Sequence, residues 1–215
     1  MDTMERPSRF GFVFYALVGL YCAWILSLPV FPSQDGPLHL YYAYVFGQLL
    51  AHSSTYSHYF YIGHYLPPYA LQYYTLVLLM KFMPAVWAEK VFVCVIVVLF
   101  ASGVRQLART VGPSGDVISL FIIPLLLNWP LAMGFHNFCL SLALGIWALK
   151  FWCEAAISRK MSARVGYIGL CMLMAVTHPV PLGLVLAFAA IELALRSYIE
   201  FKKAILERPA LIRDV

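Results

Sequence analysis

Residues 10–31, FGFVFYALVGLYCAWILSLPVF, form an apolar stretch without a single charged side chain. A helix needs about 20 apolar residues to cross the hydrocarbon core of a bilayer, so this stretch predicts a transmembrane helix. It is too long for the apolar core of a cleaved signal peptide, and it lacks a small-residue cleavage site. We therefore expect an uncleaved signal anchor at the start of a membrane protein.

The composition of the whole chain agrees with this expectation. Of its 215 residues, 62% are hydrophobic and 12% are charged, and the mean hydropathy is +0.80. Soluble domains typically have about 45–50% apolar and about 25% charged residues. This balance excludes a disordered chain, a disulfide scaffold and an ordinary cytosolic enzyme. It predicts an all-α polytopic transmembrane helix bundle, with residues 1–215 in a single membrane domain.

Five later apolar runs bring the predicted spans to about six, and they leave 196–215 as an inner C-terminal segment. These runs are residues 87–104, 117–133, 138–153, 165–177 and 180–195.

A further apolar stretch, Pro67–Met83, is ambiguous, and the basic residues decide how it is interpreted. If it does not cross the membrane, thirteen of the fifteen lysines and arginines lie on the side of the N-terminus, and only Lys81 and Lys90 lie opposite. That split satisfies the positive-inside rule. We therefore expect an inside N-terminus and an outer loop over residues 32–86 that carries two amphipathic surface helices. We attribute the net charge of +5 to basic residues in the inner loops, and we do not interpret it as a sign of nucleic-acid binding.

Tyrosine and histidine concentrate on the predicted outer side. An interfacial aromatic belt explains most of the tyrosines without any function. The histidines are harder to dismiss, because all six map to this one side. They are His39, His52, His58, His64, His136 and His178.

Asp35 is the strongest candidate for chemistry. It is the only acidic residue between Pro32 and Ala88, at the point where the first span meets the outer interface. Pro37 suits the first turn of a helix that Asp35 can cap, and His39 lies four residues on, on the same helix face. Two interpretations stay open: a helix cap, and a carboxylate base whose pKa is raised near the bilayer.

The remaining candidates lie at the outer ends of later spans. The segment NWPLAMGFHNF, residues 128–138, supplies His136 and Asn137, and THP at 177–179 supplies His178. A lone histidine at a helix end is more often structural than functional. Lys90, next to Glu89, fits an interfacial charge pair, or else Lys90 or Lys81 binds a lipid phosphate.

Cofactor motifs are sparse. The sequence contains no Walker loop, GxGxxG, HExxH or GxSxG pattern. Compact ligand spacing among the histidines is also absent, so we expect no tightly bound structural metal. A weakly bound divalent cation at Asp35 and His39 remains an open alternative.

The order of these features resembles bacterial membrane glycosyltransferases of the GT-C fold, related to protein mannosyltransferases and aminoarabinose lipid transferases. The resemblance covers the first span, Asp35 at the start of a large outer loop, the helix QDGPLHLYYAYVFGQLL and a second helix that opens with Pro67, Pro68 and Tyr69. It continues through the span that closes in RQLART before Gly112, then GFHNFCLSLALG and THP.

The resemblance implies transfer of a sugar from a polyprenyl-phosphate donor to an acceptor on the outer side of a bacterial inner membrane. It implies that Asp35 is the carboxylate that deprotonates or orients the acceptor hydroxyl. Such enzymes are usually longer, which leaves three interpretations of this chain: an N-terminal fragment, a truncated gene product or a minimal version. A partner chain is a candidate source of the missing spans, and we expect the chain to transfer little or no sugar alone.

Two alternatives to an enzyme remain. One is a non-catalytic membrane assembly subunit, and the other is a His-rich metal- or haem-binding membrane protein. Haem ligation within a bundle needs histidines that face each other across the core. Here the histidines lie at span ends or in a loop, which argues against haem.

Overall fold

The computed structural model describes residues 9–63, 69–112 and 114–211, and every regular element within them is a helix. The prediction of an all-α fold is confirmed. The elements are α1 (Arg9–Ser27), α2 (Gly36–Leu50), α3 (Ser54–Ser57), α4 (Ala70–Met80), α5 (Ala85–Val111), α6 (Gly115–Ser119), the 3₁₀ helix η1 (Leu120–Leu125), α7 (Trp129–Ala132), α8 (His136–Ser158), α9 (Met161–Ala175) and α10 (Pro179–Leu211).

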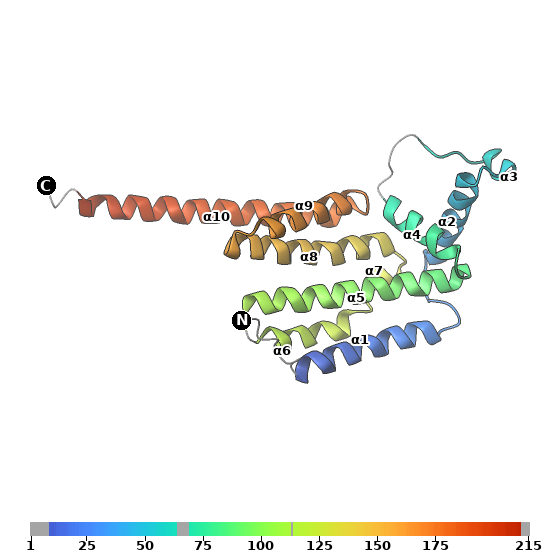
Figure 1. Cartoon of the computed structure of the whole chain (residues 1–215), viewed down its shortest axis with the longest axis horizontal. Coiled ribbons are helices and arrows are strands. Elements are labelled where there is room, and N and C mark those ends of the chain that lie inside the picture. Colours follow the sequence, from blue (N-terminus) through green and yellow to red (C-terminus); the bar gives the residue numbers. More distant parts are fainter. Residues whose placement is uncertain (1–8, 64–68, 113, 212–215) are drawn as a thin grey trace. The chain divides into compact units, whose positions relative to one another are not determined.

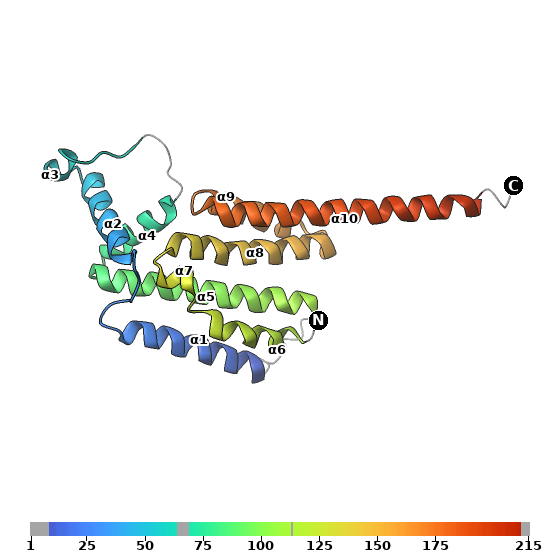
Figure 2. The same cartoon turned by 180° about the vertical axis from the view of Figure 1, so that it is seen from behind.

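The bundle is built around α5 and α8. Figures 1 and 2 both show α1, α5, α6, α8 and α9 side by side, with α2 and α4 lying across one end. Helix α1 ends there and α5 and α8 begin there, and we call this the α2–α4 end. The core between α5 and its neighbours contains small and branched side chains, among them Ala88, Val93, Val97, Ala101 and Ala143. Such residues let helices approach closely in a membrane, where lipid offers no hydrophobic driving force.

The chain is an integral membrane protein by the length and composition of its helices. Five segments of the described residues are long and apolar enough to cross a bilayer: Arg9–Ser27, Ala85–Thr110, Gly115–Ala132, His136–Ser158 and Pro179–Ala204. They correspond to five of the six predicted spans. The remaining predicted span, residues 165–177, overlaps α9, which has only fifteen residues. At 1.5 Å per residue α9 covers about 22 Å, less than the hydrocarbon core of about 30 Å.

The third span is not the continuous helix that the sequence pattern suggested over 117–133. It consists of α6, the 3₁₀ helix η1 and the short helix α7 in succession. Pro124 lies inside η1, and proline removes a backbone donor and clashes with the preceding turn. The break ends in a turn that reaches the α2–α4 end, and this turn carries residues of the candidate site.

The predicted outer loop contains the two longer helices that were expected, α2 and α4. Pro67 and Pro68 lie outside the described residues, and α4 has eleven residues, too few to cross a bilayer. Ala70, Gln72 and Leu76 form its buried face. The finding favours the surface helix over a seventh span. Which side of the membrane this loop occupies stays a prediction.

Residues up to Leu182 form one compact unit, and residues from Gly183 onward form a second. The second unit is the continuation of α10. The predicted inner segment 196–215 is therefore helical as far as Leu211. Within α10, Glu192 and Arg196 form an i,i+4 ion pair.

Candidate functional site

The two sequence motifs singled out at the α2–α4 end form one structural unit. The backbone N–H of Gln34 donates to the Ala132 carbonyl, and that of Asp35 donates to the Met133 carbonyl, each at 3.0 Å. These bonds join the connection before α2 to the turn before α8, about a hundred residues later. Asp35 is thereby fixed in place by backbone contacts.

Gly134 makes this close approach feasible. Its φ is +88°, a conformation that residues with a Cβ rarely adopt. A Cβ at this position would also lie 2.7 Å from the Gly36 nitrogen and 2.9 Å from the Asp35 nitrogen. Glycine is therefore required at position 134 for two reasons: it can adopt this φ, and it leaves room for the close approach to the backbone of Asp35 and Gly36.

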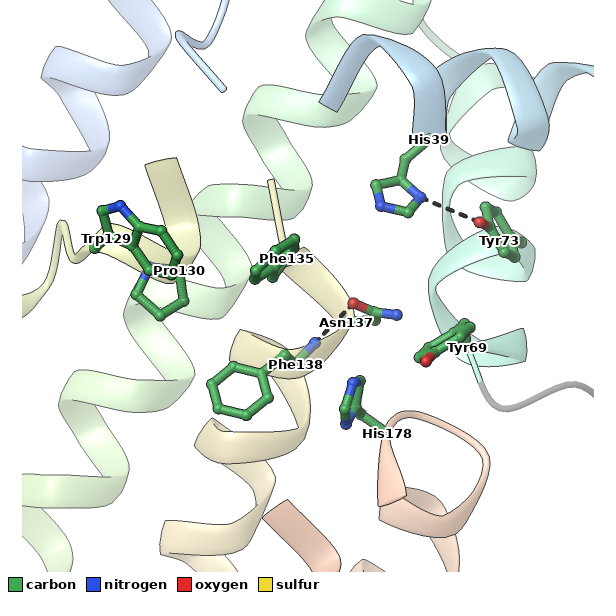
Figure 3. A pocket seen from close by; sticks show the side chains of 9 residues that line it. All are labelled: His39, Tyr69, Tyr73, Trp129, Pro130, Phe135, Asn137, Phe138 and His178. Carbon is green, nitrogen blue, oxygen red and sulfur yellow. Dashed lines mark hydrogen bonds between the residues drawn. The ribbon is translucent and has the colours of Figure 1, made fainter. Parts of the chain in front are cut away.

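A cleft of about 590 Å³ opens beside this unit (Figure 3). Five parts of the chain contribute to it: α2, the start of α4, α7 with the turn that follows it, the first turn of α8, and the turn between α9 and α10. The lining residues are His39, Tyr69, Tyr73, Trp129, Pro130, Phe135, Asn137, Phe138 and His178. Among them are six aromatic or proline rings, three polar donors, and no lysine, arginine or carboxylate of the described residues.

His39 connects α2 to α4. Its Nδ1 lies 3.1 Å from the Tyr73 hydroxyl, which leaves Nε2 for a ligand. Burial lowers the pKa of His39 from its ordinary value, and the negative charge of Asp35 partly opposes that effect. Burial likewise raises the pKa of Tyr73. Both groups are therefore neutral at pH 7, and His39 is an acceptor or donor according to its tautomer.

Asn137 and His178 each use one polar atom locally and keep the other for the cleft. The Oδ1 of Asn137 accepts from the Phe138 N–H at 2.9 Å, and Figure 3 shows its amide nitrogen directed toward the space between His39 and Tyr69. The Nδ1 of His178 accepts from the Val180 N–H at 3.3 Å. The neutral ring therefore carries its proton on Nε2.

Aromatic rings hold His178 and shape the cleft wall. Its ring centroid lies 5.3 Å from that of Tyr69 and 5.4 Å from that of Phe138. Tyr69 has a φ of +96°, a strained conformation for an aromatic residue. Such strain persists only where surrounding contacts enforce it, and it is common at binding sites. Here the Leu71 N–H donates to the Val176 carbonyl at 3.3 Å and holds the start of α4 against the turn.

Asp35 itself is half-buried and borders this site without lining the cleft. It precedes α2 as its N-cap residue, but its side chain makes no capping hydrogen bond. Pro37 lies in the first turn, as expected. Helix capping therefore does not explain the carboxylate. The charge of Asp35 raises the pKa of His39 in part, so the two side chains lie within electrostatic range of each other.

The other predicted site residues separate into different environments. His136 is 1% exposed and does not line the cleft. Its ring lies near those of Phe31 and Phe92, and its Nε2 has no hydrogen-bond partner. Lys81 is exposed at the C-terminal end of α4, away from the lining residues.

Lys90 differs most from its predicted role at a lipid phosphate. It is 2% exposed, and its Nζ donates to the carbonyls of Leu26 and Leu28. The ammonium group thereby satisfies carbonyls that the end of α1 leaves open. The structure gives Lys90 a partner within the chain.

Sequence reasoning missed the aromatic wall and one buried acid. Tyr69 and Tyr73 were grouped with an interfacial belt, although their four-residue spacing places both on one face of a helix. Glu89 was assigned to a pair with Lys90 at the interface. It is 4% exposed, and its Oε1 instead accepts from the Ser33 hydroxyl at 3.1 Å.

The structure offers no compact metal centre among the described residues, because no three His, Cys, Asp or Glu side chains come together there. Comparison with known protein families, with curated proteins and with solved structures finds no match. Inference about the site therefore rests on its own residues.

Proposed function

We propose that this chain is a membrane glycosyltransferase, or the N-terminal part of one, that transfers a sugar from a polyprenyl-phosphate donor to an acceptor hydroxyl. The single observation that carries the proposal is the position of Asp35. A carboxylate without a capping role is held by backbone bonds beside a cleft of aromatic rings and neutral hydrogen-bond donors.

The cleft has the chemistry that binds a sugar. Aromatic faces such as those of Tyr69 and Trp129 stack on the apolar faces of a pyranose ring. The Asn137 amide and the His178 Nε2–H donate to hydroxyl oxygens. A concave site with mostly apolar walls and a few convergent polar groups is typical of small-molecule binding.

Two apolar grooves next to the cleft suit the lipid part of such a donor. They have volumes of about 270 and 370 Å³ and share Trp24 and Leu127. One of them reaches Trp129, which also lines the cleft. Because α1 is apolar enough to cross a membrane, a hydrocarbon chain in these grooves remains within the bilayer while its sugar reaches the cleft.

In the proposed reaction the acceptor oxygen attacks the anomeric carbon of the donor sugar. The carbon–oxygen bond to the lipid phosphate breaks, and the lipid phosphate leaves with that bonding pair. Asp35 takes the proton of the acceptor hydroxyl. His39 is the second candidate for this proton, because it lies within the field of Asp35 and lines the cleft.

Asp35→Asn tests the proposal. The substitution keeps the size of the side chain and the backbone bonds of residue 35, but it removes the proton acceptor. Loss of a general base typically costs about 10²–10⁴-fold in rate. We expect membrane insertion and thermal stability to stay as in the unaltered protein, and transfer from a lipid-linked sugar donor to fall by that factor.

Asp116→Asn is not a suitable control, because Asp116 pairs with the buried Arg105 and joins α5 to α6. Glu154→Gln is the matched control: Glu154 lies at the opposite end of α8, and its ion pair with Lys150 is a local i,i+4 pair that contributes little to stability. This variant should leave transfer unchanged. Normal transfer by Asp35→Asn would refute the catalytic role. Binding of the donor without any transfer by the unaltered chain, alone or with a partner chain, would favour a non-catalytic subunit.

A further inference from the structure

The connection between α1 and α2, residues 28–35, is held by two consecutive residues of α5. Lys90 Nζ donates to the Leu26 and Leu28 carbonyls, each at 3.0 Å, where α1 ends. Glu89 accepts from Ser33, two residues before Asp35. Each of the two charged side chains therefore bonds to the same connection, one near its beginning and one near its end.

Glu89 also contacts the residue that follows Asp35. A Cβ added to Gly36 would overlap the Glu89 Oε1 and the Ser33 hydroxyl. The carboxylate thus lies directly against the first residue of α2. On the other side of the same backbone, Gly134 approaches the Asp35 and Gly36 nitrogens. The backbone of Asp35 and Gly36 therefore lies between α5 and the turn before α8.

Two buried charges at such a place are costly. Removing an ion from water costs several kcal/mol even after relaxation, and apolar residues of similar size are often as stable or more stable. The Lys90 ammonium lies 3.5 Å from the centre of the Trp87 ring, which recovers part of that cost. A stability role alone would be served by apolar packing, so the polar bonds to a single loop indicate a positioning role.

We infer that Glu89 and Lys90 are positioning residues that hold the connection between α1 and α2 so that the Asp35 carboxylate stays beside His39 at the cleft. The effect on catalysis rests on the proposed function. The effect on the loop does not, because it follows from the bonds to Leu26, Leu28 and Ser33 alone.

The experiment uses an exposed reporter within the connection. Gln34 is exposed while its backbone is docked on Ala132, so Gln34→Cys is introduced into the full chain after the five native cysteines are replaced by alanine. The rate at which a maleimide labels this thiol in membranes reports opening of the loop. Glu89→Ala, Glu89→Gln and Ser33→Ala are compared in this background, with Glu154→Ala as the matched control.

Glu89→Gln keeps an oxygen that accepts from Ser33, so labelling and transfer should stay within about twofold of the parental values. Glu89→Ala and Ser33→Ala lose the bond, and labelling should rise about fivefold, as expected for one net hydrogen bond. In both variants kcat for transfer should fall at least tenfold while KM for the donor changes little, because the cleft residues are untouched. Glu154→Ala should change neither quantity.

Unchanged labelling in both Glu89→Ala and Ser33→Ala would overturn the inference. A collapse of transfer in Glu89→Gln with unchanged labelling would overturn it as well, since Glu89 would then handle a proton. If Glu89→Ala fails to insert, Ser33→Ala decides the question. If the unaltered chain transfers no sugar, the labelling rates still test the positioning role, so the two proposals fail separately.

Discussion

The two ends of the bundle use their charged residues in different ways. At the end opposite α2 and α4, charges pair with one another. Arg105 Nη2 lies 2.9 Å from Asp116 Oδ1 and joins α5 to α6, and Lys150 pairs with Glu154 along α8. At the α2–α4 end, Glu89 and Lys90 bond instead to a hydroxyl and to backbone carbonyls of an irregular connection.

The difference shows what each end has to stabilise. An ion pair between two helices fixes a short turn and needs no further partner. An irregular connection exposes backbone groups that must be satisfied one by one. Charged side chains that bond to backbone groups hold a specific conformation of the connection, and at the α2–α4 end this connection contains Asp35. The two ends therefore differ in what their charged side chains bond to.

The largest expected loss of stability comes from breaking the Arg105–Asp116 ion pair at the end opposite α2 and α4. Arg105 is 7% exposed, and its guanidinium group also lies 5.2 Å from the Tyr15 ring. Arg105→Ala removes this partner of Asp116, whose Oδ1 also lies 3.8 Å from Arg109 Nε. Removing one partner of a buried ion pair costs about 3–5 kcal/mol. We expect a loss near the lower value in thermal unfolding of the protein in detergent.

Lys150→Ala is the comparison variant, because its ion pair with Glu154 is a local helix pair worth about 0.3–0.5 kcal/mol. Both variants should keep the Gln34→Cys labelling rate of the parental protein. A rise in that rate for Arg105→Ala would mean that the two ends are coupled. It would contradict the view that the charged residues of each end stabilise that end alone.

A smaller effect is expected at Gly134. Alanine there must adopt a φ of +88° and place its Cβ against the Asp35 and Gly36 backbone. The backbone term alone costs about 1–2 kcal/mol. Gly134→Ala should lower thermal stability by about that amount and should raise labelling of Gln34→Cys, because the docking contact is lost.

Gly19→Ala is the matched control for Gly134→Ala. Gly19 lies within α1, where an added Cβ meets nothing within 4 Å. In a helix interior alanine is favoured over glycine by about 0.5–1 kcal/mol. This variant should therefore be neutral or slightly stabilising, without any change in labelling. Equal losses for both glycines would contradict the docked loop.

The sequence is informative where a feature depends on local spacing. Asp35, the N-cap residue of α2, and His39 are four residues apart, so helical periodicity alone predicts that they lie on the same side of the helix. The apolar runs likewise located the spans, because length and hydropathy are properties of contiguous residues. Pro124 could have indicated the broken third span, since proline within an apolar run interrupts a helix.

The remaining features depend on contacts between residues far apart in the chain. No local pattern shows that Gln34 and Asp35 dock on Ala132 and Met133, or that Lys90 bonds to the end of α1. The cleft wall formed by Tyr69 and Tyr73 requires α4 to pack against the turn before α10. These contacts are set by helix packing, which a single sequence does not reveal.

The smallest expected effect concerns the electrostatic link between Asp35 and His39. Burial lowers the pKa of His39 below its ordinary value of 6.5, and the Asp35 charge raises it in part. Asp35→Asn removes the raising contribution, so the pKa of His39 should fall further. Histidine NMR titration of the isotope-labelled protein in detergent measures this directly. The pKa of His178, which burial alone lowers, is the internal control and should stay constant.

The sign of the accompanying stability change follows from proton binding. Because the pKa of His39 is lower in the folded protein than in the unfolded chain, the unfolded chain binds the proton more readily. The contribution of His39 to stability is therefore complete above about pH 6.5 and is lost as the pH falls below that value. Asp35→Asn should extend this loss to lower pH. A titration of His39 identical in both proteins would mean that the Asp35 carboxylate does not act on the cleft, and it would remove the electrostatic support for the catalytic pair.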